Sequence, residues 1–407
     1  MAGTESGKLI PMTSPSPERR RQLRTWKSDP DGSGLIAINS AQENATRPYL
    51  VDLASNDYLN LIQHPEIIAA AKAEMDRSGV GAGGSRLVSG SRPIHDQLET
   101  ALAQWLNRDR VLLYPSGFQA NLAAVLALAN RHTPVLADRL CHHSLLTGVK
   151  ASGARLLRFA HNDLHDLNRK LERCHEQHPD HQPLVITESL FSMEGTSPDL
   201  SSMAELCSNH GARLLVDEAH AVGVLGREGR GLCQALPHHA VTMVSGTFGK
   251  AFGSGGAFLA CNAELGEVLL QSSGAFRYTT ALAPPLAAAA LAALTLMQRH
   301  PHWSDELRAR SQHWRSRLTQ SGWPCPDGTG PILPLVIGTD QAALERQQTL
   351  ETAGLLSVAI RPPTVPEGTA RLRLVVRRIL PQNTLDALLE ALSDSTPIRT
   401  NPQPNRL

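Results

Sequence analysis

Short apolar segments alternate with polar turns and helical stretches through the middle of the chain, and this alternation restricts the fold more than any other feature. Five segments are expected to be strands: Val111–Tyr114, Pro134–Ala137, Leu184–Thr187, Leu214–Val216 and Val241–Val244. Strands that each lead into a helix indicate an α/β fold with a mostly parallel central sheet. Ligands of such sheets bind beyond the carboxyl ends of the strands. We therefore expect functional residues in the turns that follow these segments.

A smaller α/β unit is expected after Pro285. Its strands are predicted at Ile332–Ile337, Leu356–Ile360 and Leu372–Val376, and its helices at Gln341–Ala353 and Thr384–Leu392. The chain is thus expected to divide into an N-terminal segment (1–55), a large domain (56–285), a small C-terminal domain (286–394) and a flexible tail (395–407). A short basic helix is predicted at Arg19–Trp26. The residues up to Pro17 and from Ser395 onward, rich in Pro, Ser, Thr and Asn, are expected to be loose.

The composition favours a protein that binds small molecules. Lys plus Arg (39) and Asp plus Glu (38) nearly cancel, so nucleic acid and acidic membrane surfaces are not expected partners. The six cysteines are scattered without a CxxC pair, which predicts neither a disulfide scaffold nor a metal site. The N-terminus lacks the apolar core of a signal peptide, and the longest near-apolar run, Leu286–Met297, is too short to span a bilayer. These features predict a cytoplasmic location.

Lys250 stands in a glycine-rich turn that follows the fifth predicted strand. Ser245 and Thr247 place hydroxyls before it, and Gly253 and Gly256 allow the chain to turn back into another apolar segment. A lysine buried in such a turn has a lowered pKa and suits Schiff-base chemistry. A surface lysine in a flexible turn is an equally good interpretation of this stretch alone.

Polar residues follow the other predicted strands at equivalent places. Ser116, Gly117 and Phe118 come where a strand gives way to a helix, so free N–H groups could hold a phosphate there. His142, Ser192, Asp217 with His220, and Thr247 occupy the turns after other strands. Each has a plain structural interpretation as a cap or a solvated loop residue. Their predicted gathering at one edge of the sheet is what favours a functional site.

The chemistry of these residues fits a pyridine-ring cofactor. A buried Asp217 could keep the ring nitrogen protonated through a charge-assisted hydrogen bond. His142 could lie flat against the ring, and His220 could donate to the ring hydroxyl. Pyridoxal 5'-phosphate (PLP) is the common cofactor that uses all of these groups together with a lysine. The sequence therefore predicts a PLP site built around Lys250.

Two further stretches are expected to contact ligand or partner. The loop Gly79–Gly90 is too rich in glycine for a regular element, and its backbone could pass close to a ligand or a second subunit; a flexible surface loop is as probable. The stretch IRPPTVPEGTARLR carries Arg361, Thr364, Arg371 and Arg373 on a loop stiffened by prolines. An arginine held there could bind a carboxylate through two hydrogen bonds, although pairing with a surface acid is the commoner fate of an arginine.

The motifs SNDYLNL, GAGGSRLVSG, YPSGFQAN, ESLFSMEG, VDEAHAVGVLG, SGTFGKAFGSGG and IRPPTVPEGTARLR resemble those of the α-oxoamine synthases, a branch of the fold type I PLP-dependent transferases. The resemblance extends from about Arg19 to Leu392. It implies a homodimer that condenses an amino acid with an acyl thioester and releases carbon dioxide. The last motif is most similar to members that use L-alanine and a pimeloyl thioester, carried by coenzyme A or by acyl carrier protein.

The resemblance also implies roles for individual residues. Lys250 matches the lysine that bonds the cofactor, Asp217 the partner of the ring nitrogen, His142 the stacking histidine and His220 the histidine near the ring hydroxyl. Further cofactor contacts are implied for Gly117, Phe118, Ser192, Thr247 and, across a dimer interface, Thr280. Substrate contacts are implied for Arg24, Asn56, His142, Arg361 and Thr364.

Two alternatives follow from the same motifs. A relative that uses glycine or another acyl thioester, similar to 2-amino-3-ketobutyrate ligase, would share the whole constellation. A non-catalytic relative would belong to a different class of protein. The presence of Lys250, Asp217 and His220 argues against a lysine-less partner subunit, and the lack of a DNA-binding module before Arg19 argues against a transcription regulator.

Overall fold

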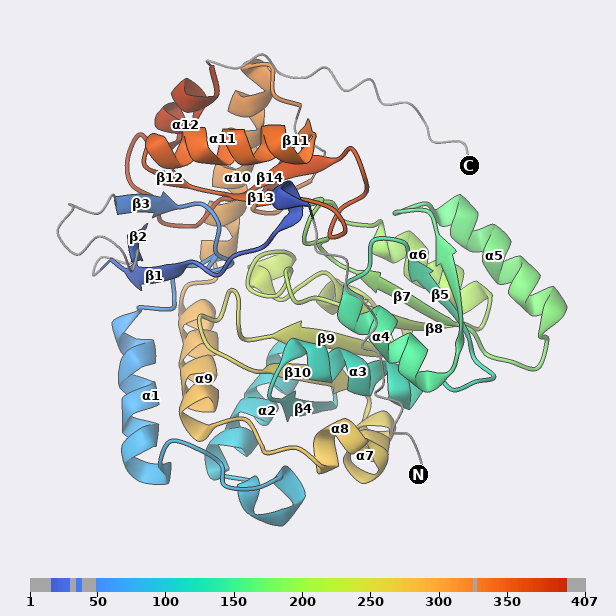
Figure 1. The fold of residues 1–407 in the computed structure, drawn as a ribbon. Helices are drawn as coiled ribbons and strands as arrows, with labels where there is room; N and C mark the ends of the chain where they lie inside the picture. The colour runs from blue at the N-terminus through green and yellow to red at the C-terminus, as the bar shows by residue number, and fades with distance from the viewer. Residues whose placement is uncertain (1–15, 30–33, 39–48, 325–327, 394–407) are drawn as a thin grey trace, which may run out of the picture.

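The computed structural model describes residues 16–29, 34–38, 49–324 and 328–393. The expectation of loose ends concerns mainly residues 1–15 and 394–407, which lie outside the described residues. The first and the last described residues, 16 and 393, both lie above the central sheet in Figure 1, on the same side as the C-terminal elements.

A seven-stranded sheet forms the centre of the fold, in the order β4-β10-β9-β8-β7-β5-β6 (Figure 1). Its strands are β4 (Arg110–Tyr114), β5 (Pro134–Asp138), β6 (Arg155–Phe159), β7 (Leu184–Glu188), β8 (Arg213–Asp217), β9 (Met243–Thr247) and β10 (Ala257–Cys261). The five strands from β5 to β9 are parallel, whereas β10 runs antiparallel between β9 and β4. Every residue of β5, β7 and β10 is buried, as expected for strands covered on both faces. The predicted mostly parallel α/β sheet is confirmed.

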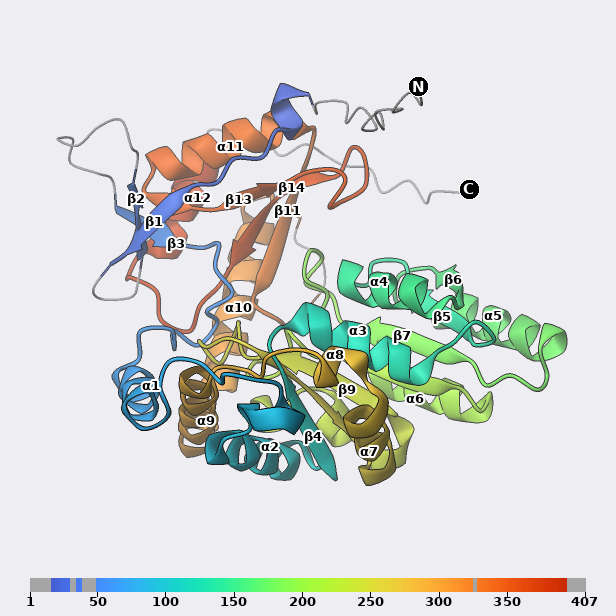
Figure 2. The same ribbon diagram turned by 60° about the horizontal axis from the view of Figure 1, so that its bottom comes forward.

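Helices cover both faces of this sheet (Figures 1 and 2). On one face lie α3 (Gly117–Leu128), α4 (His143–Ser152), α7 (Ala263–Ser272) and α8 (Gly274–Arg277). On the other lie α2 (Pro93–Leu106), α5 (Leu164–Gln177), α6 (Leu200–Asn209) and α9 (Pro284–Arg299), and α1 (Pro65–Ser78) packs along α9. The apolar stripe predicted for α2 faces the core, because Ile94, Leu98, Leu102 and Trp105 are all buried.

Two smaller sheets lie on one side of the central sheet (Figure 2). The first, of order β11-β14-β13, contains β11 (Ile332–Gly338), β13 (Val358–Ile360) and β14 (Ala370–Val375). The second, of order β1-β2-β3-β12, contains β1 (Thr25–Ser28), β2 (Gly34–Ile38), β3 (Tyr49–Asp52) and β12 (Leu355–Leu356). The accompanying helices are α10 (Trp303–Gln320), α11 (Asp340–Thr352) and α12 (Thr384–Ser393). The second sheet joins the N-terminal strands to the C-terminal region through the parallel pair β3–β12.

Three local predictions were wrong. Arg19–Trp26 does not form a helix: only Pro17–Arg19 makes a 3-10 turn, and β1 begins at Thr25. This segment has no apolar stripe, and Arg19 instead pairs with Asp340 and Glu367. The strand predicted as Leu356–Ile360 is divided between β12 and β13, which belong to different sheets.

The third error concerns the strand before the lysine turn. It does not end at Val244 but continues through Ser245 and Gly246 to Thr247, where it pairs with β10. Gly246 is needed inside the sheet because a Cβ there would lie 2.3 Å from the Phe258 ring. The glycine-rich stretch also differs from expectation at its end, where Arg86–Gly90 forms a π-helical turn. The remaining short turns are 3-10 helices at Arg227–Gly229, Cys233–Ala235 and His238–Ala240.

Candidate active site

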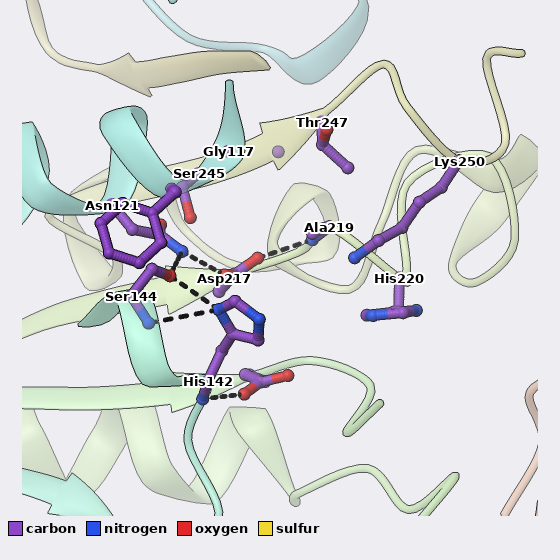
Figure 3. A pocket seen from close by; sticks show the side chains of 13 residues that line it. Gly117, Asn121, His142, Ser144, Asp217, Ala219, His220, Ser245, Thr247 and Lys250 are labelled. Carbon is purple, nitrogen blue, oxygen red and sulfur yellow. Dashed lines mark hydrogen bonds between the residues drawn. The ribbon is translucent and has the colours of Figure 1, made fainter. Parts of the chain in front are cut away.

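A cavity of about 190 Å³ opens at the carboxyl ends of β7, β8 and β9, beside the N-termini of α3 and α4 (Figure 3). Its lining contains seven residues that the sequence predicted as functional: Gly117, Phe118, His142, Asp217, His220, Thr247 and Lys250. It also contains Ser245 and Gly246, which precede Lys250 in the glycine-rich stretch, and four residues that the sequence did not single out for the site: Asn121, Ser144, Glu188 and Ala219. The turns after separate strands therefore meet at one place, as the α/β pattern predicts.

Lys250 reaches this cavity from a turn that only glycine allows. Gly253 has a φ of +62°, and a Cβ there would lie 2.6 Å from the Ile62 nitrogen; Gly256 has a φ of +97°. The side chain of Lys250 extends into the space near Asp217 and His220 (Figure 3). Burial lowers the pKa of Lys250 to about 8, while the Asp217 carboxylate acts in the opposite direction. A larger fraction of this amine is therefore unprotonated, and nucleophilic, at neutral pH.

Asp217 ends β8 as a buried carboxylate with two fixed donors. Its Oδ1 accepts a hydrogen bond from the Ala219 N–H at 2.8 Å, and its Oδ2 accepts one from Asn121 Nδ2 at 2.7 Å. Both bonds hold the orientation of the carboxyl group. A cofactor ring nitrogen that kept its proton could donate to this carboxylate.

His142 caps α4 at the edge of the cavity. Its Nδ1 lies 2.7 Å from Ser144 Oγ and accepts from the Ser144 N–H at 3.3 Å, so its proton belongs on Nε2. Asn121 Nδ2, which holds Asp217, also donates to Ser144 Oγ at 2.9 Å. One amide thus orients both the carboxylate and the histidine. Burial lowers the pKa of His142, which favours the neutral form of its ring.

Glu188 is a buried acid of the cavity that the sequence analysis missed. Its Oε1 accepts the His142 N–H at 2.6 Å. Burial, with the Asp217 charge nearby, raises the pKa of Glu188 well above its ordinary value, which favours the neutral form. The only sequence signal was its position directly after an apolar run, and the predicted strand ended one residue too early to show that Glu188 belongs to the sheet.

The start of α3 and the strand beside Asp217 offer N–H donors and one unpaired hydroxyl. Gly117 and Phe118 begin α3, where N–H groups have no partner within the helix, and the positive helix end favours an anion. Among the described residues, no hydrogen-bond partner reaches the buried Ser245 Oγ or Asn121 Oδ1. Thr247 Oγ1 already donates to the Gly256 carbonyl at 2.9 Å. Ser245 and the start of α3 are therefore the groups with free capacity for a ligand.

His220 closes the side of the cavity near Lys250. It is buried, and its Nδ1 lies 2.6 Å from the Tyr58 hydroxyl. Asn56, a predicted substrate contact, does not line the cavity but lies 3.2 Å from the same hydroxyl through its Oδ1. Its Oδ1 also accepts from Arg373 Nη2 at 2.9 Å. Asn56 is therefore two hydrogen bonds away from His220 in the cavity wall, with Tyr58 between them.

The other predicted contacts lie outside the cavity lining. Ser192 accepts from Arg373 Nε at 2.6 Å through its backbone oxygen. Arg361 donates to the Glu18 carbonyl, and Thr364 Oγ1 accepts from Arg21 at 3.0 Å. These contacts bring the N-terminal segment against the proline-rich loop.

Arg24 and Thr280 are farther from the cluster. Arg24 is paired with Glu351 at 2.6 and 3.0 Å and lies 4.4 Å above the Trp26 ring. Thr280 is exposed in the segment between α8 and α9. The described chain therefore does not bring either residue to the cavity.

The residues present fit PLP. The start of α3, which lies beside Thr247, suits its phosphate, Asp217 suits its ring nitrogen, and Lys250 suits its aldehyde. No group of His, Cys, Asp and Glu able to hold a metal occurs in the described ranges. None of the described helices is long and apolar enough to cross a membrane. Fold and site together define a fold type I PLP-dependent transferase.

Comparisons with known proteins agree with this class and refine it. Residues 48–392 match the aminotransferase class I and II family. A solved structure of SPT with the PLP internal aldimine superimposes with a TM-score of 0.84 at 25% identity, covering 91% of this chain and 92% of that one. The 8-amino-7-oxononanoate synthase of Francisella tularensis superimposes with a TM-score of 0.72 at 27% identity, covering 84% and 96%.

The match in sequence is closer still. The 8-amino-7-oxononanoate synthase of Chromohalobacter salexigens is 42% identical over 346 residues, which cover 84% of this chain and 88% of that protein. The chain belongs to the 8-amino-7-oxononanoate synthase family, within the PLP-dependent class I and II aminotransferases.

Proposed function

We propose that the chain condenses L-alanine with a pimeloyl thioester to give 8-amino-7-oxononanoate, carbon dioxide and free thiol, a step of biotin biosynthesis. The observation that carries the proposal is the single cavity in which Lys250, with its lowered pKa, meets the oriented carboxylate of Asp217. Bound PLP supplies an electron-accepting ring that stabilises negative charge on the amino acid's α-carbon. The relatives named for this activity support the choice of substrates.

Lys250 would act first as the group that bonds the cofactor and then as the base. Once released, its amine can take the proton from the α-carbon of alanine and later return one, because a pKa of about 8 suits proton transfer in both directions near neutral pH. Asp217 would hold the proton on the ring nitrogen, and Asn121 and Ala219 keep it aligned. His142 would press its neutral ring against the cofactor and present Nε2–H to the reacting side.

The substrate carboxylate is proposed to bind Arg361 and Asn56, with Thr364 and Arg24 as further contacts. Pro362 is buried and limits the movement of the Arg361 backbone, which supports a pre-positioned guanidinium. Arg373 contacts Asn56 directly and is the alternative carboxylate partner.

The assembly is proposed to be a homodimer in the cytoplasm, in which Thr280 of one subunit reaches the cofactor phosphate of the other and Ser192 lies by the cofactor. Exposed apolar side chains support a second copy near the Gly79–Gly90 loop: Val80 is 74% and Val88 82% exposed, and Tyr278, next to the Thr280 segment, is 80% exposed. The division at residues 55, 285 and 394 is kept as the proposed domain boundaries.

The deciding experiment measures free thiol while alanine, glycine and serine are each offered with pimeloyl, acetyl and palmitoyl thioesters. Pimeloyl donors are tested both on coenzyme A and on acyl carrier protein. Thiol release with alanine and a pimeloyl donor supports the proposal, and Lys250→Ala is the inactive control. Preferred turnover of glycine with an acetyl donor would instead assign the chain to the glycine-using relatives.

A further inference from the structure

The segment of the chain that contains α4 and β6 is strongly basic. Residues 131 to 160 include five Lys and Arg residues and a single acid, Asp138, although the whole chain has 39 basic and 38 acidic residues. Asp138 is fully buried and lies 3.0 Å from His161 Nδ1 through its Oδ1. No acidic side chain of this segment therefore reaches the surface to offset its positive charge.

Four exposed side chains on or beside α4 and β6 make up what we call the basic surface: Arg139, His143, Lys150 and Arg158. β6 is the last strand of the central sheet, and α4 packs beside it (Figure 2). Arg158 donates to the Arg139 carbonyl, so the loop after β5 is held against β6. Within the part of the chain that the structure describes, none of the four side chains forms an ion pair.

The neighbouring elements add no acid to this face of the sheet. Side chains alternate along β6, and Leu157 packs into the core on the face opposite α4, so Leu156 and Arg158 lie on the α4 face. α3, which packs against α4 on this face, contains no charged residue. Leu156 is 36% exposed, so an apolar side chain lies among the basic ones.

The basic surface begins at the rim of the cavity. His143 is the first residue of α4 and directly follows His142, which lines the cavity. Burial raises the pKa of Cys141, the residue before His142, whereas the Arg158 charge acts in the opposite direction, which places Arg158 near the same rim. From the rim the surface continues along α4 to Lys150 in its last turn.

The spacing of these charges fits a protein better than a single phosphate. A phosphate is bound by donors that converge on one point. Here the charges are distributed along a helix of 10 residues, which is about 15 Å long, and along the strand beside it. Separate charges around an exposed apolar side chain are typical of a surface that steers and orients a protein partner of opposite charge.

We propose that the basic surface docks an acidic acyl carrier protein, whose thioester arm then enters the cavity past His142. The inference rests on the proposed function in taking a pimeloyl thioester as the substrate, and it goes further by assigning the carrier to a particular surface. Arg139, Lys150 and Arg158 attract and orient the carrier, and the chemistry stays with the residues of the cavity.

The test measures the affinity for an acidic bacterial acyl carrier protein that is loaded with a pimeloyl group and carries a fluorescent label. Fluorescence anisotropy with PLP-loaded protein, in the absence of alanine, gives the dissociation constant. Lys150→Glu combined with Arg158→Glu should weaken binding about tenfold or more, because like charges then face each other. Raising the salt from about 50 mM to about 300 mM should weaken wild-type binding more than binding by this double variant.

Two controls separate docking from other effects of charge. Lys72→Glu reverses an exposed lysine of α1, at the opposite side of the molecule in Figures 1 and 2, and should bind the carrier as the wild type does. Pimeloyl-coenzyme A, titrated by calorimetry, should bind the double variant and the wild type equally within about twofold. An equal loss of affinity for coenzyme A would assign the surface to the phosphates of that carrier and overturn the inference.

A second measurement locates the carrier on the wild-type protein. Saturating pimeloyl-carrier protein should slow the acetylation of Lys150, read by mass spectrometry, and leave Lys72 at its free rate. Unchanged carrier affinity in the double variant, or equal acetylation of Lys150 with and without carrier, would refute the docking surface. If circular dichroism shows that the double variant does not fold, Lys150→Glu alone decides, with an expected loss of about threefold or more.

These binding measurements do not depend on turnover. A chain that fails to condense alanine with a pimeloyl thioester can still bind the carrier at the basic surface. An active chain whose carrier affinity is the same in the wild type and the double variant would reject this inference and leave the proposed function in place.

Discussion

The amine of Lys250 should titrate near pH 8 in the cofactor-free protein. Burial lowers its pKa from 10.5 to about 8 although Asp217 favours the ammonium form. At pH 7, a pKa of about 8 leaves roughly one amine in ten unprotonated, whereas an ordinary lysine leaves roughly one in three thousand. The cavity therefore raises the reactive fraction of Lys250 about 300-fold.

The assay is trace labelling with acetic anhydride across about pH 6 to about pH 11, a range that brackets both pKa values. Mass spectrometry of the peptides gives the labelling rate of each lysine, and Lys150, exposed on α4, serves as the internal standard. Asp217→Asn should move the Lys250 midpoint to lower pH, because it removes the opposite charge that favours the ammonium form. Glu176→Gln, an exposed acid on α5, is the matched control and should leave it in place.

A Lys250 midpoint near that of an ordinary lysine would refute the reasoning that burial dominates at this site. An identical midpoint in wild type and Asp217→Asn would show that the carboxylate does not act on the amine. The first result would remove the physical basis for Lys250 as the base of the reaction, whereas the second would remove only the proposed influence of Asp217 on its pKa.

Three further predictions follow from the site. The pKa of Lys250 is lower in the folded than in the unfolded protein, so the folded protein binds fewer protons at pH values between these two pKa values. The free energy of unfolding of the cofactor-free protein, compared with that of Lys250→Met, should therefore rise by about 1–3 kcal/mol from pH 8 to pH 10.5. Urea unfolding at each pH measures it. Asp217→Asn should weaken PLP binding about 10- to 150-fold through loss of a charge-assisted bond, and an unchanged dissociation constant in an absorbance titration would contradict that role. Arg361→Ala should weaken alanine binding by about thirty- to a thousandfold and spare PLP binding; an unchanged alanine constant would transfer the carboxylate to Arg373.

Much of the site could be predicted from which residues follow each predicted strand in the sequence. The sequence by itself places Lys250, Asp217, His142 and His220 directly after apolar runs, and parallel strands bring such turns to one edge of a sheet. The turn after Lys250 is also determined by nearby residues, because glycine is the residue that adopts positive φ most readily and both Gly253 and Gly256 adopt it. The α/β class, the lysine turn and the family were therefore predictable from the sequence.

The partners of these residues were not predictable in the same way. Asn121 holds both Asp217 and Ser144, yet it comes from inside α3 and reaches residues 96 and 23 positions away. Arg373 donates to Asn56, which is 317 residues away in the chain, and β12 pairs with β3, which is also distant in sequence. The spacing of apolar residues shows whether a segment is a helix or a strand, but it does not show which distant residue each side chain will contact.

Protonation was also decided only by the tertiary structure. The sequence identified Lys250 as an amine and Glu188 as an acid, and by composition each would carry its ordinary charge at pH 7. Their pKa values move in opposite directions because folding removes both groups from water, and desolvation penalises whichever form is charged. The chain order determined which chemical groups meet at the sheet edge; the depth at which they are buried, set by packing from distant segments, determined their charge.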